Sequence, residues 1–211
     1  AAVLTIIKAP SMCRTKRDLG ESAVRAESRE LVKCLRLFDG MTEEAFEQLL
    51  VGSYFQRFPA HVALIREGDP ADFLHIVVSG SVELFSNWRD RETTMSVVRP
   101  VSTFILAAVI KDAPYLMSAR TIESSDVLMI PSDNIRAAMS DAGEFSLAMV
   151  DELAASFREV VKRQKNLKLR TAVERLANYL LQQNALQGGS GRLVLPIEKK
   201  LLSSLLGMTP E

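Results

Sequence analysis

The sequence predicts an α+β chain in which a β barrel or sandwich is followed by several helices. Between Ser53 and Met129, short runs rich in β-branched and aromatic residues recur about every ten residues, with turn residues between them. From Phe145 onward, apolar residues recur at helical spacing instead. The net charge is zero, but residues 162–211 carry nine Lys and Arg against three Asp and Glu. That asymmetry is typical of a nucleic-acid-binding segment joined to a separate domain, although an ordinary amphipathic helix pair would also produce it.

The first fifty residues predict an arm and two short helices. Residues 1–28 are polar and poorly periodic, so we expect a flexible N-terminal arm. Residues 29–51 hold two helical patterns joined at Asp39-Gly40. Thr42 followed by two glutamates predicts the start of the second helix, because a hydroxyl cap and early acidic residues suit the N-terminal dipole.

The β domain is expected to hold six strands. Glycine, proline and Asx-rich turns separate them at 68–70, 79–80, 87–90 and 124–126. The strands are HVALI at 61–65, FLHIVV at 73–78, SVELFS at 81–86, TMSVVR at 94–99, YLMSARTIE at 115–123 and VLMI at 127–130. Ser132-Asp133 then predicts a cap for a short helix through Met139.

A long helix is predicted from about Phe145 to Asn166, and it carries two interleaved heptad series. Such a stripe pairs helices in coiled coils, so we predict a homodimer, with packing onto the barrel as the alternative. The residues of this predicted interface are Val150, Leu153, Phe157, Val160, Gln164 and Leu167.

Two further helices are expected near the C-terminal end. LRTAVERLANYLLQQNALQ, at 169–187, has helical periodicity and precedes a glycine-rich turn at 188–191. RLVLPI, at 192–197, predicts a short strand or wing. EKKLLSSLLGMTPE predicts a helix, a glycine turn at Gly207, and a new helix with Thr209 as its cap and Pro210 in its first turn.

Cysteine content and hydropathy indicate the compartment. Cys13 and Cys34 are too few for a four-thiolate iron–sulfur or zinc site, and we expect free thiols and no metal. No apolar run approaches the roughly 18–20 residues that span a bilayer. The opening AAVLTII lacks the basic residues of a secretory signal. We therefore predict a cytoplasmic protein without a membrane partner.

One motif indicates a family. The run LIREGDPADFLHIVVSG, from Leu64 to Gly80, places Gly68 and Gly80 in tight turns on either side of a buried strand at 74–77. It closely resembles the signature of cyclic-nucleotide-binding domains, and departs from it at His75, where the signature has an apolar or tyrosyl side chain. With the heptad helix and the terminal helix–glycine–helix, residues 30–211 resemble the Crp–Fnr family of bacterial transcription regulators.

The resemblance implies a domain plan. It comprises a jelly-roll effector domain at 29–144, a dimerisation helix at 145–168 and a winged helix-turn-helix at 169–211. It also implies double-stranded DNA with a near-palindromic operator and RNA polymerase as partners, and no enzymatic activity. The sequence stops near the start of the expected recognition helix, so for these 211 residues we expect weak or no specific DNA binding.

The DNA-contacting residues are expected around the last helix. In the cyclic-AMP receptor branch a base-reading arginine occupies the position of Pro210, which has no side-chain donor. Glu211 matches the glutamate with which many Fnr-like members accept a cytosine amino group, so we predict an Fnr-like half-site. Lys199 and Lys200 are candidates for phosphate contacts, with a solvated helix face as the alternative. Thr209 is the remaining residue that we expect to contact DNA.

The effector is predicted not to be cyclic AMP. The glycine, glutamate and arginine that bind it in this family become Leu106, Ala107 and Met117 here, and a buried phosphodiester without a cation is costly. Of the residues that bind cyclic AMP in this family, only the serine remains, as Ser118. Arg120, two residues further on, would be the cation in a shifted mode of binding. The expected effector pocket comprises Phe104, Leu106, Ala107, Ala108, Met117 and Ser118.

Two interpretations of this apolar pocket remain. It is either collapsed, leaving an insensitive or cysteine-based redox-responsive regulator, or a cavity for a flat ligand such as haem. The second resembles, in general character, the denitrification and nitric-oxide-responsive subgroup. The axial haem ligand would then be His75 or His61, with Met117, Cys13 and Cys34 as weaker candidates. A lone histidine on a strand is, however, more often a hydrogen-bonded core or surface residue.

Two other functional classes share some of these features. A cyclic-nucleotide-binding-like regulatory module that acts on a protein partner has the same β domain, but it does not need the basic helix–glycine–helix end. An enzyme is disfavoured, because the sequence holds no recognisable nucleophile–histidine pair, catalytic carboxylate pair or metal-ligand cluster.

Overall fold

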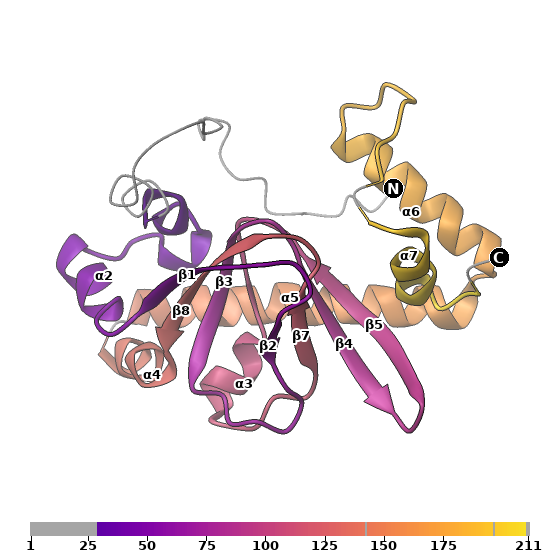
Figure 1. Cartoon of the computed structure of the whole chain (residues 1–211). Coiled ribbons are helices and arrows are strands. Elements are labelled where there is room, and N and C mark those ends of the chain that lie inside the picture. The colour runs from indigo at the N-terminus through magenta and orange to yellow at the C-terminus, as the bar shows by residue number, and fades with distance from the viewer. Residues whose placement is uncertain (1–28, 142, 196, 210–211) are drawn as a thin grey trace.

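The computed structural model describes residues 29–141, 143–195 and 197–209. Two four-stranded sheets stand between short N-terminal helices and two C-terminal helices, and one long helix runs beside them (Figure 1). The predicted arm at 1–28, with Cys13, lies outside the described residues, as do Pro210 and Glu211. Among the described helices, none is long and apolar enough to cross a membrane.

The two sheets pair strands that are far apart in the sequence. One has the order β1-β8-β3-β6 and the other β2-β7-β4-β5, with all pairs antiparallel. These nested pairs give the connectivity of a double-sheet jelly roll rather than a closed barrel. The strands are β1 (Tyr54–Phe58), β2 (Ala63–Ile65), β3 (Phe73–Ser79), β4 (Val82–Trp88), β5 (Arg91–Val98), β6 (Ser102–Phe104), β7 (Ser118–Thr121) and β8 (Ser125–Pro131).

The predicted turns around β3 are confirmed. Gly68 and Gly80 have φ values of +91° and +79°, which residues with a side chain rarely adopt. A Cβ at Gly80 would lie 2.3 Å from Ser125 Oγ, so no larger residue fits without displacing β8. Between the two turns, residues 74–78 are buried in the centre of their sheet.

A β-bulge interrupts the pairing of β4 with β5. Leu84 lies opposite Ser96 and Phe85 lies opposite Thr94, so Met95 has no residue opposite it. Such a bulge bends the strand and redirects its backbone groups. Because β5 is the last strand in its sheet, its outer edge is not paired with another strand.

The N-terminal helices close one end of the core. Residues 29–33 are helical, η1 spans Arg36–Phe38 and α2 spans Glu43–Leu49. The predicted cap is confirmed, because Thr42 Oγ1 accepts a hydrogen bond from Ala45 N–H (3.2 Å). Phe38 stacks on Phe145 with ring centroids 6.2 Å apart, which joins these helices to the beginning of the long helix.

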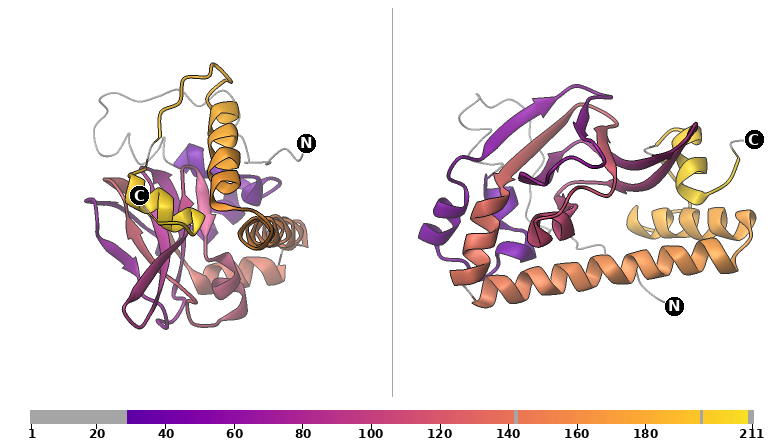
Figure 2. Two further views of the ribbon diagram at one scale, coloured as in Figure 1. Left: turned by 90° about the vertical axis from the view of Figure 1, so that its right-hand side faces the viewer. Right: turned by 90° about the horizontal axis from the view of Figure 1, so that it is seen from below.

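Three helices follow or interrupt the strands. They are α3 (Leu106–Lys111), α4 (Ser132–Asp141) and α5 (Gly143–Leu169). With 27 residues, α5 is about 40 Å long and spans the molecule beside both sheets (Figure 2). It continues three residues beyond the predicted end at Asn166, because the next helix starts only at the cap Thr171.

The C-terminal helices α6 (Ala172–Leu186) and α7 (Lys199–Leu206) are both as predicted. Residues 192–197 were predicted as a short strand or wing; the strand is wrong for the residues described there, since 192–195 form no strand, and the wing stays a prediction. The residue types of this run favour a strand, but the side-chain amide of Gln187 occupies the backbone groups that a partner strand would bond. It accepts from Val194 N–H (3.0 Å) and donates to Val194 C=O (2.8 Å).

Candidate functional site

The segment expected to form the effector pocket is divided between the core and the surface. Phe104, Leu106 and Ala108 are buried in the core between the sheets and α3, whereas Ala107 faces solvent. A left-handed residue, Ile105 with φ +58°, ends β6 and begins α3. The sequence did not predict this helix, because a short continuous apolar run has the same pattern in a strand and in a buried helix.

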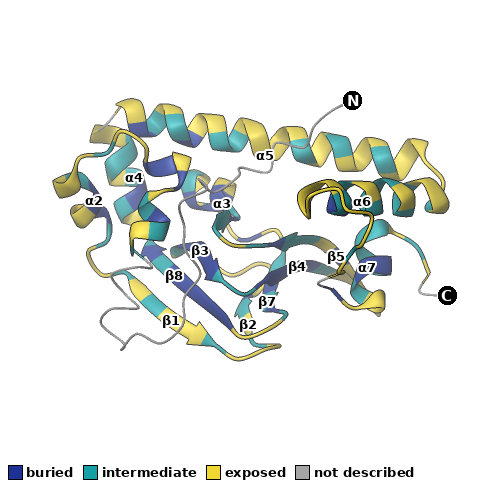
Figure 3. Cartoon of the chain, turned by 90° about the horizontal axis from the view of Figure 1, so that it is seen from above, coloured by how far each residue is buried: buried dark blue, intermediate teal, exposed yellow. Residues whose placement is uncertain are grey.

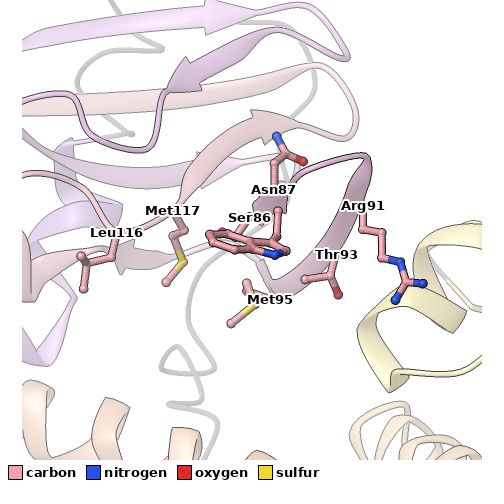
Figure 4. A pocket seen from close by; sticks show the side chains of 8 residues that line it. Ser86, Asn87, Arg91, Thr93, Met95, Leu116 and Met117 are labelled. Atoms are coloured by element: carbon pink, nitrogen blue, oxygen red, sulfur yellow. The ribbon is translucent and has the colours of Figure 1, made fainter.

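An open pocket of about 380 Å³ lies beside this segment, under the hairpin formed by β4 and β5 (Figure 4). Its apolar lining residues are Trp88, Met95, Leu116 and Met117, and its polar lining residues are Ser86, Asn87, Arg91 and Thr93. Trp88 and Leu116 are highly exposed, at 75% and 80%. Of the predicted pocket residues, Met117 alone is in this lining.

The hairpin's contribution to the pocket was not predicted. Its lining residues belong to the hairpin of β4 and β5, and the pairing of β4 with β7, where Phe85 lies opposite Ser118, brings this hairpin beside Met117. In Figure 4 the side chain of Arg91 extends away from Met117 and Leu116, so the cation stands at the rim of the pocket.

The shifted cation considered at Arg120 is engaged elsewhere. Ser118 and Arg120 share a strand face, as predicted: both pair with β4 at alternate positions, opposite Phe85 and Glu83. Arg120 donates to Glu83 (2.7 Å) and makes two bonds to Glu92 (2.7 and 3.2 Å). Its guanidinium also lies 4.2 Å from the ring centroid of Phe85.

This network leaves no free charge on Arg120 for an anion. Glu83 is 3% exposed, and its second oxygen accepts from Thr94 Oγ1 (2.6 Å). The carboxylate is therefore fully hydrogen-bonded in the interior of this face, where it requires Arg120 as its counter-charge. Ser118 Oγ likewise has a partner, because it accepts from Glu67 N–H (3.0 Å).

The two candidate haem ligands lie in different surroundings. His75 is 5% exposed and packs between the rings of Phe104 and Tyr115, with centroids 5.3 and 6.4 Å away. Its Nδ1 is 3.1 Å from Phe73 O, and burial lowers its pKa to about 4, so the ring is neutral at pH 7. His61 is exposed in a turn with φ +63°.

These positions set the condition for haem binding. His75 is absent from the pocket lining, and its ring belongs to the packed interior. For His75 to ligate iron, the ring would have to leave its packing with Phe104 and Tyr115. Ligation by either histidine stays a prediction.

The heptad stripe on α5 is largely exposed. Val150, Phe157, Val160 and Leu167 are 58%, 69%, 55% and 51% exposed, and Gln164 is exposed as well. Leu153 is the exception, because it packs partly on the core. Figure 3 shows exposed residues recurring along the whole helix. The alternative of packing onto the β domain therefore applies to the apolar residues only at the beginning of the helix, where Phe145 and Met149 are buried. Further along, Arg163 Nη1 donates to Met95 C=O on β5 (2.7 Å).

The C-terminal helices are joined by one arginine. Arg175, on α6, donates to the carbonyls of Leu206 (2.7 Å) and Gly207 (2.9 Å) at the end of α7. Gly207 has φ +62°, which allows the chain to turn there as predicted. A capping box at Thr171 and Glu174 fixes the start of α6. The two helices and the turn are thus held in one arrangement.

The predicted DNA-contacting residues lie around this turn. Lys199 and Lys200 are exposed at the beginning of α7, and Thr209 is exposed two residues after Gly207. Within the described part of the chain, neither lysine side chain makes a hydrogen bond or an ion pair; the contact of Lys200 is through its backbone C=O, which accepts from Ser203 Oγ. Glu211 and Pro210 are outside the described part of the chain.

Comparison with known proteins supports a family relationship for the β domain. Residues 55–142 match the profile of the cyclic nucleotide-binding domain. The CRP-like cAMP-activated global transcriptional regulator of Mycobacterium tuberculosis is 25% identical over 187 residues, covering 86% of this chain and 84% of its own.

Solved structures share the fold at lower identity. FixK2 from Bradyrhizobium japonicum has a TM-score of 0.67 and 20% identity, covering 75% of this chain and 79% of its own. DNR from Pseudomonas aeruginosa has a TM-score of 0.56 and 21% identity, covering 92% of this chain and 85% of its own. The chain therefore holds a cyclic-nucleotide-binding-like β domain and is similar to CRP-like regulators over most of its length.

Proposed function

We propose that this chain is a cytoplasmic, dimeric transcription regulator of the Crp–Fnr kind, controlled by an effector other than cyclic AMP. The carrying observation is the pocket itself. Under the hairpin, Met117 occupies the position where the resemblance expects an arginine, and Arg120 is bound to Glu83 and Glu92. An apolar ligand suits this lining better than a phosphodiester, whose charge would lose hydration without gaining a buried cation.

DNA binding is supported by charge and by helix arrangement. The net charge of +6 over residues 162–211 lies on the segment that holds α6, the Arg175 clamp and α7. Lys199 and Lys200 are exposed at the N-terminal end of α7, where they can contact phosphates. In a winged helix-turn-helix, α7 would be the first helix of the motif and Gly207 would lie in its turn. Glu211 would then contact a base of an Fnr-like half-site. RNA polymerase is the further partner that this function requires.

Dimerisation is supported by α5. An apolar stripe over two and a half heptads that stays more than half exposed is unfavourable in water, and a second α5 would cover it. Dimerisation would also give the two-fold symmetry that a near-palindromic operator needs.

The DNA proposal is tested by binding to a random duplex library with and without Lys199→Ala/Lys200→Ala. We expect enrichment of two-fold symmetric sites by a chain extended to carry a complete helix-turn-helix. The double variant should bind all sequences more weakly, with a salt slope smaller by about 1 for each lost phosphate contact. Binding of no duplex at all, together with retention on a protein partner, would favour the regulatory-module alternative instead.

Haem is a second candidate effector, because the hydrogen bond between His75 Nδ1 and Phe73 O is the kind of support that orients a ligating imidazole. Titration with hemin, with and without nitric oxide, tests it. A saturable Soret band that is lost in His75→Ala would assign the ligand, and one that is lost in His61→Ala would assign the exposed histidine. Without a specific band, an organic effector or a collapsed, cysteine-dependent regulator is left.

A further inference from the structure

Strand β1 is the longest sheet edge that stays open. Of the four edge strands, β2 and β6 have three residues each. The edge of β5 is engaged by the C-terminal helices, because Thr94 N–H donates to Ser204 Oγ on α7 (2.8 Å) and Met95 C=O accepts from Arg163 on α5. The five residues of β1 pair with β8 on one side and, within the described part of the chain, with no strand on the other (Figure 3). An extended segment can add to such an edge through its backbone groups.

The surroundings of this edge lack a cover. Val51 and Tyr54 are 66% and 59% exposed, and Gln56 is exposed as well. Directly before β1, Ser53 Oγ is buried without a hydrogen-bond partner among the described residues, and the same holds for Arg29 Nε beside α2. Buried polar atoms are normally paired. The two unpaired atoms and the exposed apolar side chains indicate that a further segment belongs at this end of the molecule.

The first residues of the same chain have the composition of a strand. The run VLTII, at 3–7, holds four β-branched residues out of five, and such residues favour extended structure. Lys8 and Pro10 end the run, because proline has no N–H to give to a ladder. Its five residues match the length of β1.

The attachment of the arm allows this run to reach β1. The arm joins the described chain at Arg29, whose guanidinium pairs with Glu43 and Glu47 on α2. This helix of seven residues is about 10 Å long, and β1 follows it after a turn of four residues. Residues 8–28 can extend to about 70 Å. The linker is therefore several times longer than the helix that separates Arg29 from the edge.

We propose that residues 3–7 of this chain add to the free edge of β1 as a fifth strand of the β1-β8-β3-β6 sheet. Successive side chains of paired strands alternate between the two faces. One set of side chains from the run would therefore lie beside Phe55, which packs on the core, and the other beside the exposed ring of Tyr54. The inference goes beyond the proposed function and does not rest on it.

The first experiment measures amide hydrogen exchange over 54–58 by NMR in the whole chain. We expect slow exchange both for the amides that face β8 and for the alternate amides that face outward. Ile6→Pro removes a donor from the added strand, so exchange of the outward amides should become about tenfold faster. The matched control is Ser22→Pro, which changes the same arm outside the run. Fast outward amides in the natural chain, no effect of Ile6→Pro, or an equal effect of Ser22→Pro would each overturn the proposal.

The second experiment locates the run with a spin label, which broadens the NMR signals of nearby nuclei. In a Cys13→Ser/Cys34→Ser background, the label is attached at Gln56→Cys on β1 or, as the control, at Arg89→Cys in the turn between β4 and β5 of the other sheet. We expect the methyl signals of residues 3–7 to broaden with the label at position 56 and not with the label at position 89. Broadening from position 89 alone, or from neither position, contradicts docking at β1.

A mixed sample separates the arm of the same chain from the arm of a second copy. The chain that is spin-labelled at position 56 is left without isotopes and is equilibrated with an isotope-labelled, cysteine-free chain. We expect no broadening of residues 3–7 in this mixture. Broadening there would assign the contact to a second copy and overturn docking within one chain. None of these measurements involves DNA, so failure of this inference and failure of the proposed function are distinguishable.

Discussion

His75 should make the stability of the fold depend on pH between about pH 4 and pH 6.5. Its burial lowers the pKa to about 4, whereas the unfolded chain protonates it near 6.5. The unfolded state therefore binds more protons between these values, and the folded state loses stability as the pH falls. The contribution is complete above about pH 6.5 and is fully lost only below about pH 4.

The expected size follows from these two pKa values. The whole difference corresponds to about 3 kcal/mol, at about 1.36 kcal/mol per pH unit. Between pH 7 and pH 5 the part that is lost is about 2 kcal/mol, because His75 is still mostly neutral in the folded protein at pH 5. With a urea m-value of about 2 kcal/mol/M, the midpoint should fall by about 1 M.

The assay is urea unfolding at pH 7 and pH 5, at one fixed protein concentration because self-association adds to stability. Carboxylates also titrate in this range, so the quantity of interest is the difference between wild type and His75→Phe, which keeps a ring between Phe104 and Tyr115. The chain has only one other histidine, and His61→Asn is the matched control. Equal pH dependence in wild type and His75→Phe, or loss of the dependence in His61→Asn, would refute the reasoning.

Three further changes have expected outcomes. Arg120→Met leaves the buried carboxylate of Glu83 without its counter-charge and should lower the free energy of unfolding by about 3 kcal/mol in urea titration; a neutral effect would show that water replaces the arginine. Gly80→Ala forces a Cβ into β8 at a positive φ and should cost about 2 kcal/mol or more by thermal unfolding, unless the turn rearranges freely. Val160→Glu places a charge in the α5 stripe and should give a monomer in light scattering, whereas Ala155→Glu, one helix face away, should not; a dimer in both would exclude α5 as the interface.

Local signals predicted local structure well. Thr42 and the glycines at 68 and 80 act through their own backbone or nearest neighbours, and all three stand where the sequence placed them. The long helix was visible because its apolar period repeats over more than two heptads. Its end was placed too early, since the signal that stops it is the capping box of the following helix.

Features that depend on distant pairing were not predicted. β1 was missed because YFQRF acquires its role from β8, more than sixty residues away. The pocket was placed on residues 104–108, whereas only Met117 of the predicted set lines it, because the hairpin tip contributes most of the lining. Nothing in the sequence near Arg120 predicted that it would bond to both Glu83 and Glu92.

The docking of α7 also affects the solubility of the protein. An exposed strand edge offers its backbone to any other strand and is a common start of aggregation. While α7 and Arg163 occupy the groups around the bulge, the edge of β5 is closed to such pairing. When the helices detach, the irregular backbone at Met95 and the charges of Arg91 and Glu92 still discourage a second strand. The contacts of α7 and Arg163 with this edge, together with the bulge, thus oppose pairing of β5 with a second copy of the chain.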